Sequence, residues 1–241
     1  MKKIVNRILR KMKNVALRPF RRVRDLCEDA AFFYGYEKKE GWHDPYVPPL
    51  PSMYKKREKI WCRFSDEDED REYPVHDFEM KMNVYYISSL EAENKKAWDH
   101  ILYQCRKAKE KGYIPMDSFY YGKLYEEKIR QGEVHDVMVR WTGEEMGYGL
   151  FARGEISEGD FIGEYTGVIK KCRYWRNNLN DYCFRYPTAP VSYILYAIDA
   201  QLRGNEMRFI NHSSDPNAET VSLLVDDMLH IGVRALRKIP S

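Results

Sequence analysis

The spacing of apolar and polar residues follows one pattern in the first half of this chain of 241 residues and another in the second half. In the first half, apolar residues recur at the three- to four-residue spacing of an amphipathic helix, and residues 91–111 show this most clearly. Its apolar stripe consists of Trp98, Ile101, Leu102, Cys105 and Ala108. Gly112 follows as a candidate helix C-cap. We expect the stripe to pack against the protein core.

Residues 1–24 also show helical spacing, but their polar face is entirely basic. The segment holds ten Lys or Arg residues and no acidic residue. It predicts a basic amphipathic helix that contacts an anionic surface or nucleic acid, or that acts as a targeting segment. It contains no Ser, which counts against an organellar transit peptide. A helix docked on its own domain, with a solvated basic face, is an equally good interpretation.

Two short segments break the periodic pattern. Residues 43–53 are rich in Pro and cannot form a regular helix. Residues 66–70 are five consecutive acids, which we interpret as an exposed loop in preference to a metal site.

From residue 136 the pattern changes to short apolar runs separated by Gly, Pro, Asn and Asp. The runs are VMVRW, GLFARG, DFIGEYTG, YILYAIDA and RFINHS. Such runs are typical of short β-strands joined by turns. The pattern therefore predicts a helical and irregular region over residues 25–135 and a β-rich region over residues 136–241, which is α+β overall.

Composition narrows the class of protein without naming a function. Hydrophobic residues make up 44% and aromatic residues 14%, which excludes wholesale disorder. No apolar run reaches the roughly 18 residues of a transmembrane helix. Beyond residue 24 the chain holds 30 basic and 37 acidic residues, so only the first segment favours nucleic-acid binding. Five cysteines without a C-x-x-C pair argue against a disulfide framework and a Cys-rich zinc site, and favour a reducing compartment.

Three features of the second half are candidates for chemistry. The first is Gly147-Tyr148-Gly149, where glycine lets the backbone approach a ligand closely, although a hairpin turn uses the same residues. It is neither a dinucleotide fingerprint nor a P-loop. The second is the run RFINHSSDPN at residues 208–217, in which Asn211 and His212 offer groups that bind a purine-like ring edge. Asn and Ser are also common in plain turns.

The third feature is a cluster of tyrosines. Aromatic walls with phenol hydroxyls suit a narrow channel around an aliphatic, cationic side chain, although Tyr also fills ordinary sheet faces. The cluster consists of Tyr165, Tyr182, Tyr186, Tyr193 and Tyr196.

Together, GYG, EYTG, YCF, YAIDA and RFINHSSDPN stand in an order and spacing that resembles the SET domain. This is the family of S-adenosylmethionine-dependent protein-lysine methyltransferases. The resemblance covers about residues 136–241 and is closest to small stand-alone SET proteins such as those of intracellular bacteria. It implies a mainly β fold of short curved sheets with a knot-like closure. It also implies S-adenosyl-L-methionine as cofactor, a lysine-containing protein such as a histone as substrate, and no metal.

The resemblance assigns roles to individual positions. The backbone of Met146, Gly147 and Tyr148 would hold the amino-acid end of the cofactor. The cofactor's adenine and neighbouring groups would lie against Asn211 and His212, with Phe209 beside them. The lysine channel would be lined by the catalytic residues Tyr182 and Tyr196.

The family continues beyond its final strand with a GEEL-like turn and a Tyr-Asp-Tyr stretch that supplies another channel tyrosine. The sequence reaches Ser241 where that segment would begin. This leaves an alternative function, namely a catalytically impaired module that binds the cofactor or a peptide. For either function we expect an intracellular protein of the cytoplasm or nucleus, in a host cell if the source is bacterial.

Overall fold

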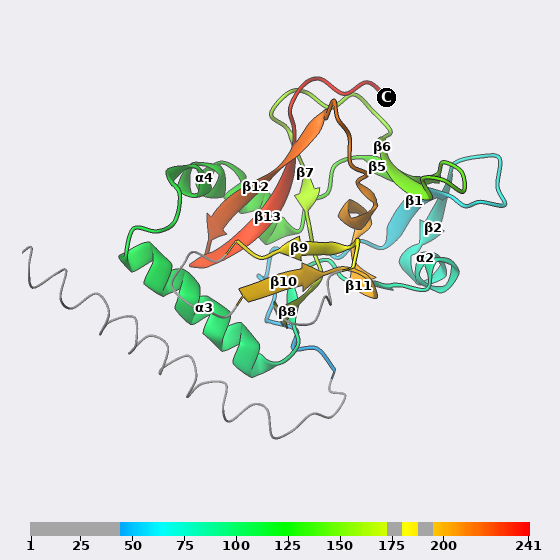
Figure 1. The fold of residues 1–241 in the computed structure, drawn as a ribbon. Helices are drawn as coiled ribbons and strands as arrows, with labels where there is room; N and C mark the ends of the chain where they lie inside the picture. The colour runs from blue at the N-terminus through cyan, green and yellow to red at the C-terminus, as the bar shows by residue number, and fades with distance from the viewer. Residues whose placement is uncertain (1–43, 173–179, 188–194) are drawn as a thin grey trace, which may run out of the picture.

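The computed structural model describes residues 44–172, 180–187 and 195–241, which form several short sheets with helices on the outside (Figure 1). The first sheet has the strand order β2-β1-β5-β6. Its strands are β1 Lys59–Arg63, β2 Arg71–Pro74, β5 Val137–Trp141 and β6 Tyr148–Ala152. Strands β1 and β5 run parallel, and the other neighbours are antiparallel.

Two further sheets carry most of the second half. One has the order β4-β8-β10-β9 and the other the order β12-β13-β7. The strands of the first are β4 Glu91–Ala92, β8 Val168–Cys172, β9 Cys183–Arg185 and β10 Leu195–Asp199. The strands of the second are β7 Phe161–Glu164, β12 Ala218–Val225 and β13 Met228–Ala235. A small parallel pair joins β3 Tyr85–Tyr86 to β11 Arg203–Gly204.

The described helices are α2 Val75–Met82, α3 Lys95–Glu110, α4 Met116–Gln131 and the 3₁₀ helix η1 Glu206–Phe209. Helix α3 confirms the helix predicted from the apolar stripe. The Asn94 side chain accepts from the N–H of Ala97 at 2.9 Å and caps its start. Its end is closed by Gly112, whose φ of 66° suits glycine, with the Tyr113 N–H bonded to the Ala108 carbonyl at 2.9 Å.

Helix α4 lies close against β12, and glycine permits this approach. A Cβ at Gly122 would lie 2.3 Å from the carbonyl oxygen of Leu224, so any side chain there would force the two elements apart. Helix α3 packs on the main hydrophobic core, and its buried residues Ile101 and Cys105 belong to the same cluster as Tyr186 and Ile198.

Three of the four described sheets join strands of residues 136–241 to strands of the preceding region, and the β12-β13-β7 sheet does not. Strand β1 pairs with β5, β4 with β8, and β3 with β11. The change in sequence pattern near residue 136 is therefore a change in secondary structure and not a gap between two separate bodies. The mainly β, α+β fold class is confirmed, while the region before residue 136 also contributes four short strands that were not expected. The knot-like closure stays a prediction.

The Pro-rich segment and the acidic run are both irregular, as predicted, although the acidic run is only partly exposed. Residues 44–53 contain no helix, and Tyr46 forms an isolated bridge with Ala92. The acidic run 66–70 is the β1–β2 connection, but Asp70 is bound by Arg63 and Arg140 at 2.8–2.9 Å, so the run is partly anchored. The basic segment 1–24 lies outside the described residues. None of the helices described is both long and apolar enough to cross a membrane.

The expectation that RFINHS forms a strand was wrong. Residues 206–209 form η1 because the Asn205 side chain accepts from the N–H of Met207 at 3.2 Å and turns the chain. The Asn205 amide also donates to the carbonyl of Glu164 at 2.7 Å, which fixes this turn on β7. The motif is thus a short helix followed by an irregular segment.

Candidate active site

A cleft of about 970 Å³ opens where the ends of α2, β5 and η1 meet the starts of β6 and β9. These elements are far apart in the sequence, and each provides residues of the cleft lining from its end or from the adjoining turn. The open end of the β12–β13 hairpin closes one side, through Ala218, Thr220 and Val233. The cleft therefore depends on the packing of segments that are distant in the sequence.

The glycine motif forms one end of this cleft. Gly147 has a φ of 69°, in the left-handed region that favours glycine, and it lies at the end of the turn between β5 and β6. That turn is closed by the N–H of Gly147, which donates to the carbonyl of Gly143 at 2.8 Å, and by the N–H of Thr142, which donates to the carbonyl of Gly147 at 2.8 Å. The backbone at Met146–Tyr148 is thus held in one defined conformation along the cleft wall.

The second motif meets the first directly. The Asn211 amide lies 3.4 Å from the carbonyl oxygen of Tyr148. A Cβ at Gly149 would lie 3.4 Å from the same amide nitrogen, so glycine leaves room for this approach. Asn211 and His212 are exposed and line the cleft. Two segments more than 60 residues apart therefore form one continuous wall.

Aromatic rings support this wall from behind. Phe209 is 5% exposed, and its ring centroid lies 6.1 Å from that of Tyr148. Tyr148 in turn lies 5.0 Å from Trp141 and 6.5 Å from Phe64. Edge-to-face contacts of this kind fix ring orientation. Phe209 thus packs beneath the cleft, while the backbone of Tyr148 remains at its surface.

Tyrosines and one arginine form the opposite end. The Tyr165 hydroxyl donates to the carbonyl of Tyr182 at 2.7 Å, and burial raises the pKa of Tyr165, so it stays a neutral donor. The Arg208 guanidinium lies 4.2 Å from the ring centroid of Tyr182 and donates to the carbonyl of Gln201 at 2.8 Å. Burial lowers the pKa of Arg208. Its Nε is buried and meets no acceptor among the described residues.

The region before residue 136 contributes to the cleft in two ways. Lys81 and Met82, at the end of α2, are part of its lining. Arg57 forms an ion pair with the fully buried Glu206 at 2.8 Å, and the Tyr86 hydroxyl donates to the same carboxylate at 2.8 Å. These contacts hold η1 in place from outside the motif. The sequence patterns gave no indication of either role.

The structure brings together all of the predicted site residues except one. The residues that line the cleft are Met146, Gly147, Tyr148, Tyr182, Phe209, Asn211 and His212. Tyr196 lies elsewhere, because it is 0% exposed and its hydroxyl is 2.8 Å from Nδ1 of His100 on α3. Tyr186 is also buried and donates to the Leu229 carbonyl at 2.6 Å. Tyr193 lies outside the described residues.

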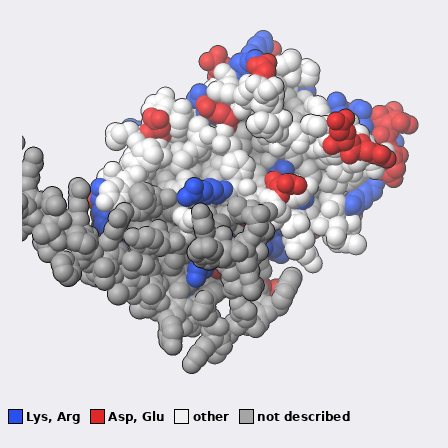
Figure 2. Space-filling model, in the orientation of Figure 1, with Lys and Arg blue, Asp and Glu red and all other residues white. Residues whose placement is uncertain are grey.

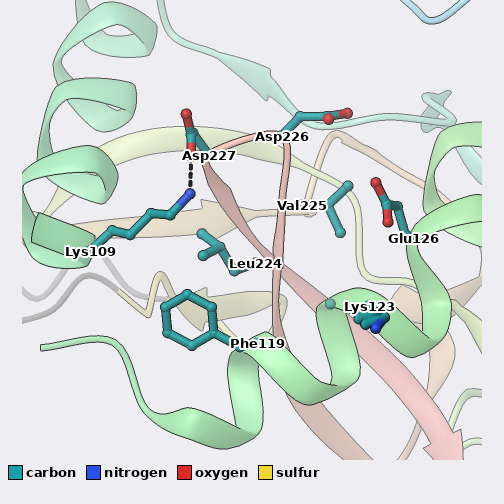
Figure 3. A pocket seen from close by; sticks show the side chains of 9 residues that line it. Lys109, Phe119, Lys123, Glu126, Leu224, Val225, Asp226 and Asp227 are labelled. Carbon is teal, nitrogen blue, oxygen red and sulfur yellow. Dashed lines mark hydrogen bonds and ion pairs between the residues drawn. The ribbon is translucent and has the colours of Figure 1, made fainter. Parts of the chain in front are cut away.

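A second hollow, of about 590 Å³, lies between α3, α4 and the turn of the β12–β13 hairpin (Figure 3). Most of its charged side chains are paired with one another or with a neighbour. Lys109 donates to Asp227 at 2.6 Å, and Arg130 donates to Asp226 at 2.5 and 3.0 Å. No predicted site residue lines this hollow. Among the residues described, no cluster of His, Cys, Asp or Glu is suited to hold a metal ion.

The second half of the chain matches the family model "SET domain" over residues 147–241. The "Variant-silencing SET domain-containing protein" of Plasmodium falciparum is 32% identical over 127 residues, which are 49% of this chain and 5% of that protein. The "Putative histone-lysine N-methyltransferase ASHH4" of Arabidopsis thaliana is 36% identical over 101 residues, 40% of this chain and 28% of that protein.

The "Histone-lysine N-methyltransferase, H3 lysine-36 specific" of Saccharomyces cerevisiae is 38% identical over 96 residues, 39% of this chain and 13% of that protein. This chain therefore spans less than a third of the length of these relatives. The solved structure of ATXR5 in complex with histone H3.1 has a TM-score of 0.48 at 19% identity, covering 69% of this chain and 80% of that one.

The match to the family model includes the glycine motif, the tyrosine end and the Asn211–His212 segment, which are the parts that the fold brings together. The resemblance inferred from the motifs is confirmed. The finer likeness to small bacterial proteins stays a prediction. The chain thus carries a SET domain over residues 147–241, and the relatives that match this part of it include proteins named histone-lysine N-methyltransferases.

Proposed function

We propose that this chain transfers a methyl group from S-adenosylmethionine to the side-chain amine of a protein lysine, with the reaction in the cleft described above. The observation that carries the proposal is the contact between Asn211 and the Tyr148 carbonyl. It joins the glycine motif and the Asn-His segment into one wall with tyrosines at the opposite end, so cofactor and lysine can be held in one cleft.

The cleft suits a cofactor of this kind in size and in chemistry. Its volume lies at the upper end of the range of about 300–1,000 Å³ that is usual for small-molecule sites. The exposed polar groups of Asn211 and His212 can bind the adenine and its neighbouring groups, with Phe209 beneath them. The backbone of Met146–Tyr148 would hold the amino-acid end. When bound, the cofactor supplies a methyl group on a sulfonium, which is already reactive.

The tyrosine end has the properties that a lysine nucleophile needs. A lysine amine has an ordinary pKa of about 10.4 and is protonated at neutral pH, so it is a poor nucleophile. Rings of Tyr182, Tyr165 and Phe184 line this end of the cleft, and a lysine amine that lost water on entering between them would favour its neutral form. The chain's main contribution is then alignment, because holding the amine in line with the methyl group lowers the barrier without a covalent enzyme intermediate.

Histones are the first substrates to examine, because two of the relatives described above are named histone-lysine methyltransferases. A lysine-rich protein other than a histone fits the same chemistry. Such a substrate, together with the cysteines that the sequence places in a reducing compartment, favours action in the cytoplasm or nucleus.

The experiment is a methyl-transfer assay with isotope-labelled S-adenosylmethionine and core histones or a lysine-rich protein. We expect label on lysine, with a changed rate or number of methyl groups in Tyr182→Phe. The control Tyr120→Phe removes a hydroxyl from an exposed tyrosine of α4 outside the cleft, and should behave as the parent. Cofactor binding by a folded parent without any transfer would favour the alternative of a binding module and contradict the proposal.

A further inference from the structure

The positive charges of the cleft are separated between its two ends. Arg208 lies at the tyrosine end, over the ring of Tyr182. Lys81 lies at the glycine end, since its ammonium is 4.2 Å from the ring centroid of Phe64, and that ring is 6.5 Å from the ring of Tyr148. Lys81 comes from α2 and lies outside the SET-domain match, so no motif assigns it a role.

Lys81 is held in place while its charge is retained. Its Nζ donates to Oε1 of Glu67 at 2.9 Å, and this bond raises the pKa of the ammonium. Glu67 is itself fixed by the Tyr73 hydroxyl and by the Phe64 N–H at 3.1 Å. Burial opposes ionisation of Glu67, but these hydrogen bonds prevail and lower its pKa to about 2.

The ammonium has hydrogen-bonding capacity beyond this pair. It carries three donors, and Glu67 is its one hydrogen-bond acceptor among the described residues. The Lys81 side chain is 42% exposed, so its charge remains accessible from the cleft. A charged N–H donor on the lining of a cleft can form a strong hydrogen bond with a carboxylate.

We propose that Lys81 binds the carboxylate at the methionine end of S-adenosylmethionine, with Glu67 as the positioning residue that holds the ammonium. This inference rests on the proposed function, and it assigns the region before residue 136 a direct part in cofactor binding. The backbone of Met146–Tyr148 alone offers only dipoles to that end of the cofactor, whereas Lys81 offers an ammonium that keeps further N–H donors beyond its bond to Glu67. Arg208 cannot serve this purpose, because it lies over the Tyr182 ring at the other end.

The test uses two ligands that differ in one group. S-adenosylmethionine and its decarboxylated analogue, which lacks the carboxylate and keeps the sulfonium and adenosine, are titrated calorimetrically into the whole chain. We expect Lys81→Met to weaken binding of S-adenosylmethionine about 10-fold, the effect of one hydrogen bond to a charged group. Binding of the decarboxylated analogue should change less than about two-fold.

Lys95→Met is the matched control. Lys95 also lies on a helix, donates to a carboxylate (Asp99 at 2.5 and 2.7 Å) and has its ammonium 5.6 Å from an aromatic ring centroid, but it lies outside the cleft. It should leave both affinities unchanged. Lys81→Arg keeps the charge and should retain most of the preference for the ligand with the carboxylate. Thermal melts confirm that each variant is folded, and Lys81→Gln replaces Lys81→Met if the latter is not.

The two proposals fail in distinguishable ways. Equal weakening of both ligands by Lys81→Met, or no weakening of either, would overturn the role of Lys81 and leave the proposed function in place. A parent that binds both ligands equally well would do the same. A folded parent that binds neither ligand would overturn the proposed function, and this inference with it.

Discussion

The β12–β13 hairpin borders both hollows of the molecule, one at its open end and one at its turn. At the open end, Ala218, Thr220 and Val233 line the cleft. At the turn, Asp226 and Asp227 border the second hollow, where both carboxylates are already bound by cations of α3 and α4. Figure 3 shows the pair formed by Lys109 and Asp227.

The chemistry of the two hollows differs more than their size. In the cleft, the Asn211 amide makes one long contact, Arg208 Nε has no acceptor among the described residues, and Gly147 is held in a left-handed conformation. In the second hollow, Lys109 binds Asp227 and Arg130 binds Asp226, and these pairs hold a tight turn against the helices. A buried donor without an acceptor and a glycine held in a left-handed turn indicate a ligand site, whereas carboxylates bound across a hairpin turn indicate a structural role.

Acidic side chains near the cleft include both exposed residues and residues bound by specific partners. Figure 2 shows acidic side chains gathered at the end of the molecule that carries the β1–β2 connection, the end from which Glu67 reaches Lys81. Some acids of this run are exposed, but Glu67 and Asp70 make specific hydrogen bonds. Their placement fixes α2 and β5 beside the cleft.

The largest expected effect is on stability, at the helix beside the second hollow. Gly122→Ala places a Cβ 2.3 Å from the Leu224 carbonyl oxygen, and backbone cannot yield as a flexible side chain would. We expect the free energy of unfolding to fall by about 3 kcal/mol, measured by urea denaturation. Affinity of the folded protein for S-adenosylmethionine should not change. A loss of affinity in protein shown to be folded would contradict the separation of the two hollows.

The next effect is on binding, at the cleft. Asn211→Ala should weaken S-adenosylmethionine binding by roughly 2 kcal/mol, because it leaves polar partners unpaired in the complex. Calorimetric titration measures this, with Asn217→Ala as control, since Asn217 is an exposed residue of the same segment outside the cleft lining. Equal affinity in Asn211→Ala and the parent would mean that the segment is only a turn.

The same substitution, Tyr to Phe, can be compared at Tyr196, which is buried, and at Tyr182, which lines the cleft. Tyr196→Phe removes the buried hydrogen bond to His100 and should lower the free energy of unfolding by about 1–2 kcal/mol. Tyr182→Phe should keep stability within about 1 kcal/mol and alter the methylation rate or the number of methyl groups added. Thermal melts beside methylation assays separate the two. An equal effect on the rate from Tyr196→Phe would return that residue to the site.

The smallest effect concerns the exposed ion pair at the hairpin turn. The hydrogen bond from Arg130 lowers the pKa of Asp226. The pair therefore stabilises the folded state at pH values above the ordinary aspartate pKa of about 3.9. This stabilisation is lost as the pH falls through the lower pKa that Asp226 has in the folded state. Asp226→Asn should cost at most about 0.5 kcal/mol at neutral pH, since Asn tolerates the left-handed turn and exposed pairs contribute little. Urea denaturation at neutral and acidic pH should show the difference shrinking in acid.

Periodicity predicted the regular elements well, because those elements depend on local patterns. The helical stripe located α3, and VMVRW is β5 without a change of boundary. Strand β1 was not predicted, although Ile60 and Cys62 alternate in burial with their neighbours. Its pairing partner β5 lies more than 70 residues away, and a run of five residues does not reveal such a partner.

The sequence predicted the site residues only where a local motif contains them, as with Gly147 and Asn211. Tyr182 and Tyr196 are the same residue type in adjacent strand regions, and only the register of β10 turns Tyr196 toward His100 on α3. Lys81 gives no local signal, because its place in the cleft depends on the packing of α2 over Phe64. Both outcomes follow from contacts between distant segments.

Hydrogen–deuterium exchange with and without S-adenosylmethionine tests most directly which hollow is the functional site. We expect slower amide exchange at residues 146–149 and 209–213 when the cofactor is added, because both segments of the cleft wall would be held by the ligand. Exchange at residues 119–126 and 224–227, around the second hollow, should stay the same. Protection confined to the second hollow, or no protection anywhere at a saturating cofactor concentration, would contradict the assignment of the cleft as the site of methyl transfer.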